Sequence, residues 1–301
     1  MNSLSKPEIR RKFVLLSRAA SGLMLCSALV HGSGCSRETS SAKGRESDTG
    51  KPRQREKLLV TGSSTMAPLV EEIARHFQAL HTNVEVTVKM GGSGRGIQDV
   101  REGISEIGMA SRALTESEAD LLGLPIARDG ICLLVNSANP VRSLTDAQVS
   151  AVYTGATTNW KAVGGLDAPI FVVTRTEGRS ELELFLHYFK INKTAVKAHS
   201  SAGDNLTGIQ AVSTNRDAIA FLSVGEAERN AKAGAPIRLL PTAGVVASSQ
   251  NIRTGTYPLS RPLTLVTKGV PKGAVAEFLD YCLLPRIGEL IRRHEFVPFL
   301  D

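Results

Sequence analysis

Residues 58–80 read LLVTGSSTMAPLVEEIARHFQAL, and this stretch decides the fold class. Leu58-Leu59-Val60 is typical of a short buried strand, and Gly62-Ser63-Ser64-Thr65 of a turn. Apolar residues then recur at helical spacing through 66–80, at Leu69, Val70, Ile73, Phe77 and Leu80. A strand, a turn and a helix in succession form the repeating unit of α/β folds.

The same alternation continues along the chain. Further strands are predicted at 84–88, 106–109, 131–135, 170–174, 218–224 and 263–266. A second helix is predicted from residue 97, and Thr115-x-x-Glu118 and Thr145-x-x-Gln148 are capping boxes that open others. This pattern predicts an α/β fold with mostly parallel strands.

The charge of the chain is concentrated in its N-terminal part. The chain has 301 residues, with 36 Lys and Arg against 29 Asp and Glu. Residues 1–57 hold 12 of the basic and 5 of the acidic groups, so 24 of each remain in 58–301. A protein that binds nucleic acid is expected to carry its excess of basic residues on the folded domain, so we expect no nucleic-acid partner.

Residues 1–34 have the layout of an export signal. Basic residues at 6–18 precede a short apolar segment, Ala19–Val30, and small residues lead to Cys35. A cysteine at this place resembles a bacterial lipoprotein signal, which predicts lipidation of Cys35, although Gly32 stands where that signal usually has Leu. Ordinary secretion and a retained anchor are the alternatives.

Residues 35–57 lack apolar periodicity and are predicted to be a flexible linker. The mature protein is therefore expected in the periplasm or at the cell surface, membrane-anchored, or secreted and soluble.

Three strand-to-helix loops carry small hydroxyl residues and glycines. They are 63–65, 93–96 and 178–180, and Arg175 leads into the last. The first turn of a helix presents unpaired N–H groups and the positive end of the helix dipole, which attract anions. Such loops meet outside the carboxyl ends of the strands in an open α/β sheet. Ordinary helix capping is the alternative for each loop alone.

A wider resemblance joins these features. The body resembles the PstS-like phosphate-binding proteins of phosphate ABC importers, in family order, over roughly residues 58–300. The matching strings include Gly62-Ser63-Ser64-Thr65-Met66-Ala67-Pro68-Leu69, Gly92-Ser93-Gly94-Arg95-Gly96-Ile97, Ile107-Gly108-Met109-Ala110-Ser111-Arg112, Asp129-Gly130, Ala218-Ile219-Ala220-Phe221-Leu222-Ser223 and Tyr257-Pro258-Leu259-Ser260-Arg261-Pro262.

The resemblance implies an α/β periplasmic-binding-protein architecture of two lobes with a ligand cleft between them. Lobe 1 would comprise 58–133 and 250–301, and lobe 2 would comprise 134–249. The implied anion-binding residues are Ser64, Thr65, Ser93, Ser111, Arg175, Gly178, Arg179, Ser180 and Glu181. The implied partners are phosphate or a related small oxyanion and an ABC-transporter permease. The protein is expected to be a monomer that touches the membrane only through its lipid anchor.

Two positions depart from the family pattern and leave the anion open. Many relatives have Asp at the position of Ser111, and many have Gly-Ser-Gly-Thr where this chain has Gly178-Arg179-Ser180-Glu181. A carboxylate that faces a dianion repels it unless one of the two is protonated or paired. Glu181 could pair with Arg179, or it could accept a hydrogen bond from a hydroxyl-bearing oxyanion.

The remaining motifs predict no catalysis, no metal and no cofactor. No zinc-ligand spacing and no G-x-S-x-G motif is found in the sequence. A secreted phosphatase or esterase on the same fold, and an anion-sensing lipoprotein without a transporter, remain alternative functions. Cys132 and Cys282 are predicted to be buried thiols, although a disulfide is possible, and Trp160 is predicted to pack in a lobe. Arg112 is expected in a salt bridge or at the anion.

Overall fold

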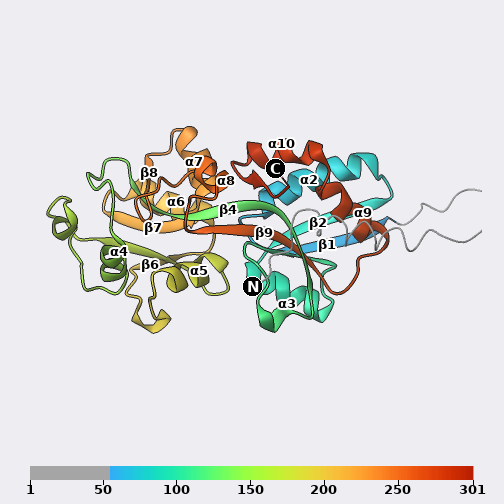
Figure 1. The fold of residues 1–301 in the computed structure, drawn as a ribbon, viewed down its shortest axis with the longest axis horizontal. Coiled ribbons are helices and arrows are strands. Elements are labelled where there is room, and N and C mark those ends of the chain that lie inside the picture. Colours follow the sequence, from blue (N-terminus) through green and yellow to red (C-terminus); the bar gives the residue numbers. More distant parts are fainter. Residues whose placement is uncertain (1–54, 301) are drawn as a thin grey trace, which may run out of the picture. The chain divides into compact units, whose positions relative to one another are not determined.

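The computed structural model describes residues 55–300, in which strands and helices alternate (Figure 1). The strands are β1 (Glu56–Gly62), β2 (Val84–Met90), β3 (Ile107–Ala110), β4 (Leu122–Asn136), β5 (Phe171–Arg175), β6 (Ser200–Ala202), β7 (Ala218–Ser223), β8 (Ile237–Leu240), β9 (Ser260–Thr267) and β10 (Val297–Pro298). The helices are α2 (Ala67–Leu80), α3 (Ser93–Glu102), α4 (Asp146–Tyr153), α5 (Ser180–Tyr188), α6 (Asn205–Thr214), α7 (Val224–Lys232), α8 (Ser249–Arg253), α9 (Gly273–Cys282) and α10 (Pro285–Arg293). Short 3-10 turns lie at Glu116–Glu118, Trp160–Val163 and Lys193–Ala195.

Two long strands join the two halves of the sheet. The strand order is β2-β1-β3-β9-β4-β7-β5-β6, with β8 and β10 also pairing with β4. We call β2, β1 and β3 with their helices the first half, and β7, β5, β6 and β8 with theirs the second half. β4 pairs with β9 over Leu122–Gly130 and with β7 over Ile131–Val135. Figure 1 shows β4 and β9 running side by side between the two halves.

The sheet is mixed, and the expectation of mostly parallel strands holds only within each half. β1 pairs in parallel with β2 and β3, and β5 pairs in parallel with β6 and β7. The pairs that involve β4 or β9 are antiparallel. The reason is that β4 and β9 cross between the halves in opposite directions, which alternation along the sequence does not reveal.

Three predicted boundaries need correction. β1 begins at Glu56, so the linker predicted for 35–57 ends before that residue. The capping box at Thr115 opens only a 3-10 turn. The helix predicted from residue 97 begins at Ser93, inside the glycine-rich loop. The start of this helix packs directly on β1. A Cβ atom on Gly96 would lie only 2.6 Å from the Thr61 carbonyl oxygen, so the contact leaves no room for a side chain.

Aromatic rings form the centre of the core in the second half. Phe221 on β7 stacks on Phe185 of α5, with ring centroids 3.8 Å apart, and both rings contact Tyr153 edge-on. Trp160 is buried in the same cluster, as predicted. Cys132 and Cys282 are buried free thiols, so the predicted burial is confirmed and the disulfide alternative is wrong.

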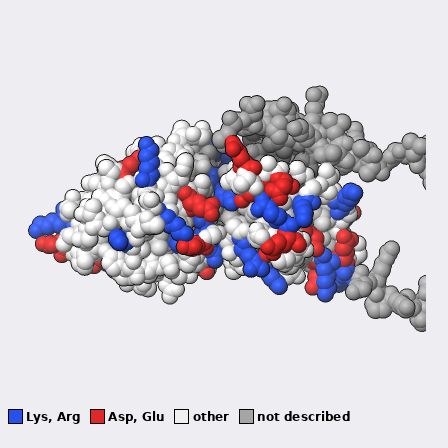
Figure 2. Space-filling view, turned by 90° about the horizontal axis from the view of Figure 1, so that it is seen from below, with Lys and Arg blue, Asp and Glu red and all other residues white. Residues whose placement is uncertain are grey.

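Charges of both signs intermix on the face of the molecule seen in Figure 2, where Lys and Arg lie beside Asp and Glu. This arrangement agrees with the equal numbers of basic and acidic groups in residues 58–301. Within residues 55–300, no helix is both long enough and apolar enough to cross a bilayer.

The aromatic stack gives a test of the core. Phe221→Ala should lower the free energy of unfolding by about 3–5 kcal/mol, because it removes a buried ring and leaves a cavity. Urea unfolding measures this change. Leu166→Ala, at a side chain that is 45% exposed, is the control and should change stability by less than about 1 kcal/mol. Equal losses in the two variants would contradict this description of the core.

Candidate anion-binding site

Four serine hydroxyls from both halves meet at the carboxyl ends of the strands. Ser63 follows β1, Ser93 begins α3 after β2, Ser111 follows β3, and Ser180 begins α5 after β5. The Ser111 hydroxyl lies 2.9 Å from that of Ser63, 3.3 Å from that of Ser93 and 2.8 Å from that of Ser180. The Ser93 hydroxyl also donates to Ser180 at 3.2 Å. All four residues are buried, so a hydroxyl cluster spans the two halves.

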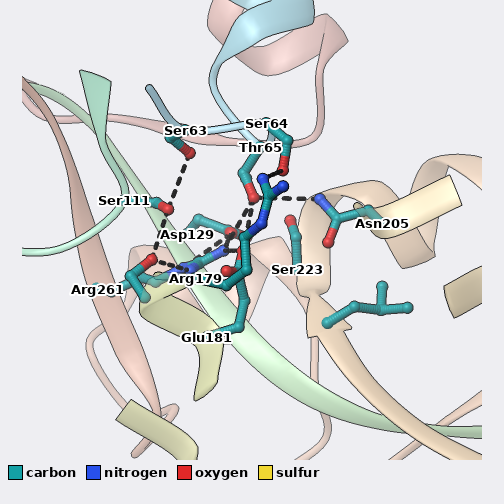
Figure 3. A network of polar contacts seen from close by, with 12 residues as sticks. Ser63, Ser64, Thr65, Ser111, Asp129, Arg179, Glu181, Asn205, Ser223 and Arg261 are labelled. Atoms are coloured by element: carbon teal, nitrogen blue, oxygen red, sulfur yellow. Dashed lines mark hydrogen bonds and ion pairs between the residues drawn. The ribbon is translucent and has the colours of Figure 1, made fainter. Parts of the chain in front are cut away.

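A buried ion pair lies beside this cluster (Figure 3). The Arg261 guanidinium donates to Asp129 at 2.9 Å and to Glu181 at 3.0 Å, and the three side chains are at most 3% exposed. Arg261 and Asp129 face each other across β9 and β4, and Glu181 comes from α5. Arg261 also donates to the Ser180 hydroxyl at 3.2 Å. The strands that cross between the halves therefore supply charged groups to the site.

Thr65 connects the first half to Glu181. The Thr65 hydroxyl donates to Glu181 Oε1 at 2.7 Å, and the Asn205 amide donates to the Thr65 hydroxyl at 3.1 Å. Burial raises the pKa of Glu181, but Arg261, Arg175 and the Thr65 hydrogen bond outweigh burial and lower this pKa to about 2. Glu181 is therefore an ionised carboxylate at neutral pH.

Arg175 is a buried cation with unused donors. It ends β5, is 2% exposed, and its Nη1 donates to the carbonyl oxygen of Asp204. Among the described residues, its Nε and Nη2 atoms have no hydrogen-bond partner. Burial lowers the pKa of Arg175, with Glu181 opposing and Arg261 adding to that effect. An arginine stays protonated in proteins, so an anion that bonds these two donors would remove a substantial desolvation cost.

The loops around 64, 92–94 and 178–179 also touch. The Gly94 amide donates to the carbonyl oxygen of Gly178 at 3.2 Å, and Arg179 donates to the Ser64 hydroxyl at 3.2 Å. The sequence left two alternatives for Glu181. The structure does not show the first of them, a pair with Arg179, because Arg179 contacts Ser64 and Glu181 contacts Arg261. Residues two apart at a helix start point in different directions, so Arg179 reaches Ser64 while Glu181 reaches Arg261.

The structure brings together most of the residues predicted for the anion. Thr65, Ser93, Ser111, Ser180 and Glu181 belong to one hydrogen-bonded network. Ser64, Gly178 and Arg179 lie in the contacting loops. Arg112 makes the salt-bridge alternative, with Glu118 at 2.8 Å and Glu183 at 3.1 Å. Contact between an anion and the residues predicted to bind it stays a prediction.

Sequence reasoning missed Arg261, Asp129 and Asn205. Asp129 and Arg261 stand in strings that carry the family resemblance, but 132 positions separate them and nothing local links them. Asn205 begins α6 in a segment with no motif of its own. The cross-strand register of β4 and β9 is what makes the first two neighbours.

Comparisons with known proteins identify the family of the chain. Residues 41–286 match the model of the PBP superfamily domain. The chain belongs to this superfamily, and within it to the PstS-like proteins. It is 28% identical to phosphate-binding protein PstS of Bacillus subtilis over 97% of this chain and 95% of that protein. It is 30% identical to protein SphX of Synechococcus elongatus over 81% of this chain and 78% of that protein.

Solved structures show the same two-lobed fold. A candidate phosphate ABC transporter substrate-binding protein of Clostridium perfringens, with phosphate bound, superposes with a TM-score of 0.74 at 30% identity. That match covers 81% of this chain and 99% of the other. An ABC-type phosphate transport receptor from Vibrio cholerae gives a TM-score of 0.68 at 29% identity, covering 81% and 100% of the two chains. The predicted architecture is confirmed, while the residue limits of the lobes stay a prediction.

The low pKa of Glu181 predicts a pH effect on stability. A carboxylate whose pKa falls on folding stabilises the protein above its unfolded pKa and loses that contribution as pH falls through its folded pKa. The stability advantage of the wild type over Glu181→Gln should therefore shrink between the ordinary value of 4.5 and about 2.

Urea unfolding of both proteins across this pH range measures the difference. Glu177→Gln, which neutralises an exposed carboxylate in the preceding loop, is the control and should show a far smaller change. A difference between wild type and Glu181→Gln that is constant with pH would contradict the assignment of Glu181 as ionised.

Proposed function

We propose that the protein is an extracytoplasmic substrate-binding protein that captures phosphate, or a related small oxyanion, for an ABC importer. The matched relatives named as phosphate-binding proteins support the ligand class, and they are binding proteins rather than enzymes. The anion would lie between Arg175 and the hydroxyls of Thr65, Ser93, Ser111 and Ser180. The protein would release it to the permease, with no catalytic step and as a monomer.

Two donors of the Arg175 guanidinium that have no partner among the described residues carry this proposal. Its Nε and Nη2 atoms have no partner within residues 55–300, although the side chain is 2% exposed. A buried cation with two free donors on one edge matches two oxygens of a tetrahedral oxyanion. The hydroxyl cluster adds donors whose hydrogen atoms rotate toward a new acceptor.

Movement of the two lobes would open and close the site. Lobe 1 would be 58–133 with 250–301, and lobe 2 would be 134–249. β4 and β9 cross between them, so bending of these two strands would separate Ser64 from Arg179 and Gly94 from Gly178. Hinge closure of this kind around a ligand is common in periplasmic binding proteins.

Loss of Arg175 should weaken anion binding with little effect on folding. Arg175→Ala should reduce phosphate affinity by about two orders of magnitude, because a desolvated charge-assisted contact contributes about 3 kcal/mol. Isothermal titration calorimetry with phosphate measures this, and circular dichroism confirms the fold. Arg101→Ala removes an arginine whose partner is Asp120 and is the control. Unchanged affinity in Arg175→Ala would remove Arg175 from the site.

The membrane anchor is part of the proposal, and Cys35 lies outside the described residues. Labelled fatty acid should mark the wild type and the control Cys132→Ser, in which a buried thiol is replaced, but not Cys35→Ser. Gel fluorography of cell fractions measures the label. Equal labelling of all three proteins, or a wild type found only in the soluble fraction, would contradict anchoring at Cys35.

A further inference from the structure

The C-terminal segment 294–298 links the two halves of the sheet apart from β4 and β9. It follows α10, which contacts α2 of the first half. Phe296 then packs on the start of α7 in the second half, where a Cβ atom on Gly225 would lie 2.7 Å from the Phe296 ring. Val297 pairs with β4 and belongs to the same buried cluster as Phe221. Figure 1 shows α10 and α7 above the crossing strands, and α3 and α5 below them.

His294 contacts both halves through its two ring nitrogens. Its Nε2 atom lies 2.7 Å from the Glu72 carboxylate on α2, and its Nδ1 atom lies 2.9 Å from Nη1 of Arg229 on α7. The side chain of His294 is 12% exposed. Arg229 is itself fixed, because its Nη2 atom donates to both carboxylate oxygens of Glu226, at 2.8 and 2.7 Å. A single imidazole ring therefore connects α2 to α7.

These two contacts require the neutral form of His294. A guanidinium has no acceptor atom, so Nδ1 must accept the hydrogen bond from Arg229. An ionised carboxylate has no donor, so Nε2 must carry the ring proton and donate it to Glu72. Burial raises the pKa of Glu72, but hydrogen bonds from His294 and Arg293 outweigh burial and lower this pKa, which keeps Glu72 ionised at neutral pH. A second ring proton, on Nδ1, would place the N–H donors of His294 and Arg229 against each other.

The surroundings of His294 oppose this second proton. The charged groups that face the ring come from α2, α7, α10 and the segment itself: Glu72, Glu226, Arg229, Lys232, Arg293 and Glu295. Burial lowers the pKa of His294, and Arg229 adds to that effect, while Glu72 opposes it. The contact with Arg229 is therefore intact at neutral pH, and it is lost as pH falls below the ordinary histidine pKa of 6.5.

The backbone next to His294 is strained. Glu295 has a φ of 57°, in the left-handed region that residues other than glycine rarely adopt. Its ion pair with Lys232 at 2.7 Å and the burial of Phe296 hold the chain in this conformation. Such strain persists only where the surrounding contacts fix it. Loss of the bond between His294 and Arg229 would therefore remove one of the contacts that keep this segment in place.

Helix α7 connects this contact to the anion site. The Gly225 amide at its start donates to Asp129 Oδ1 at 3.1 Å, and Asp129 pairs with Arg261. Arg229 follows Gly225 by four residues, which is about one turn of the helix. The same helix is thus attached to Asp129 beside the hydroxyl cluster and, one turn later, to His294.

We propose that neutral His294 holds α7 against the first half, and that protonation of His294 at mildly acidic pH releases α7 and weakens anion capture. His294 is then a positioning residue, which acts on the site through α7 and Asp129. The inference rests on the proposed function only for its effect on the anion, because the release of α7 is measured without a ligand.

Hydrogen–deuterium exchange of the full chain measures the release of α7. In the wild type, peptides that cover 224–232 and 294–298 should exchange about fivefold faster at about pH 5.5 than at about pH 7.5, after correction for the intrinsic effect of pH, because one proton is linked to opening. His294→Gln should change by less than about twofold, because a side-chain amide can donate to Glu72 and accept from Arg229 at every pH.

Two further variants bracket this result. His294→Ala keeps neither bond, so the same peptides should exchange fast at both pH values. The control His76→Gln replaces an exposed histidine on α2 and should keep the wild-type profile. Wild-type exchange that is the same at both pH values would overturn the inference.

An NMR titration of the histidine rings gives a second measurement that does not depend on the glutamine variant. The His294 signals, assigned by their absence from His294→Ala, should titrate below the ordinary value of 6.5 in the wild type. A pKa of His294 above that value would overturn the inference. If His294→Gln fails to fold, this titration and the wild-type exchange decide.

Calorimetry with inorganic phosphate connects the release of α7 to anion capture. The wild type is compared with His294→Gln at each pH, so the protonation of phosphate itself cancels in the ratio of their affinities. The two proteins should bind alike at about pH 7.5, and the wild type should bind about fivefold more weakly at about pH 5.5. Equal affinities at both pH values would overturn the positioning role of His294. No phosphate binding by either protein would contradict the proposed function, and the exchange measurement would still decide whether α7 is released.

Discussion

The buried pairing of Arg261 with Asp129 and Glu181 is the interaction on which the site depends. It joins β9 to β4 through directly facing residues and joins both crossing strands to the start of α5. A buried cation without a partner costs several kcal/mol, so these three groups stay together. Asp129 also accepts from the Gly225 amide at the start of α7, which fixes the carboxylate further.

This pairing leaves Arg175 as the cation for a ligand. Arg261 has two carboxylates, whereas Arg175 has only one backbone carbonyl acceptor within the described part of the chain. Both arginines stabilise the charged form of Glu181, because each lowers the pKa of its carboxyl group. The site thus combines Arg261, whose ion pairs with two carboxylates hold the structure together, with Arg175, which has two donors available to an anion. Contacts such as Arg112 with Glu183, an exposed carboxylate, are worth about 1 kcal/mol or less and would not hold the lobes closed alone.

The sequence predicts the strand-turn-helix units and most of the hydroxyl groups because these are local features. Ser63 to Thr65 follow a strand and precede a helix, and that order alone places them at the carboxyl edge of the sheet. Arg175 is predictable for the same reason. The pairing of Arg261 with Asp129 is not predictable in this way, since it depends on the register of two antiparallel strands that cross between the halves. The partner of Glu181 is likewise set by the approach of α5 to β9 and not by its neighbour Arg179.

The measurement that tests the central claim most directly is a crystal structure of the protein grown with phosphate. The account predicts one tetrahedral anion within hydrogen-bond distance of Nε and Nη2 of Arg175, with hydroxyls from Ser93 or Ser111 of the first half and Ser180 of the second also bound to it. The Arg261 pairs with Asp129 and Glu181 should remain intact. An anion held by Arg261 in place of Glu181, or phosphate absent from Arg175 at saturating concentration, would contradict the account.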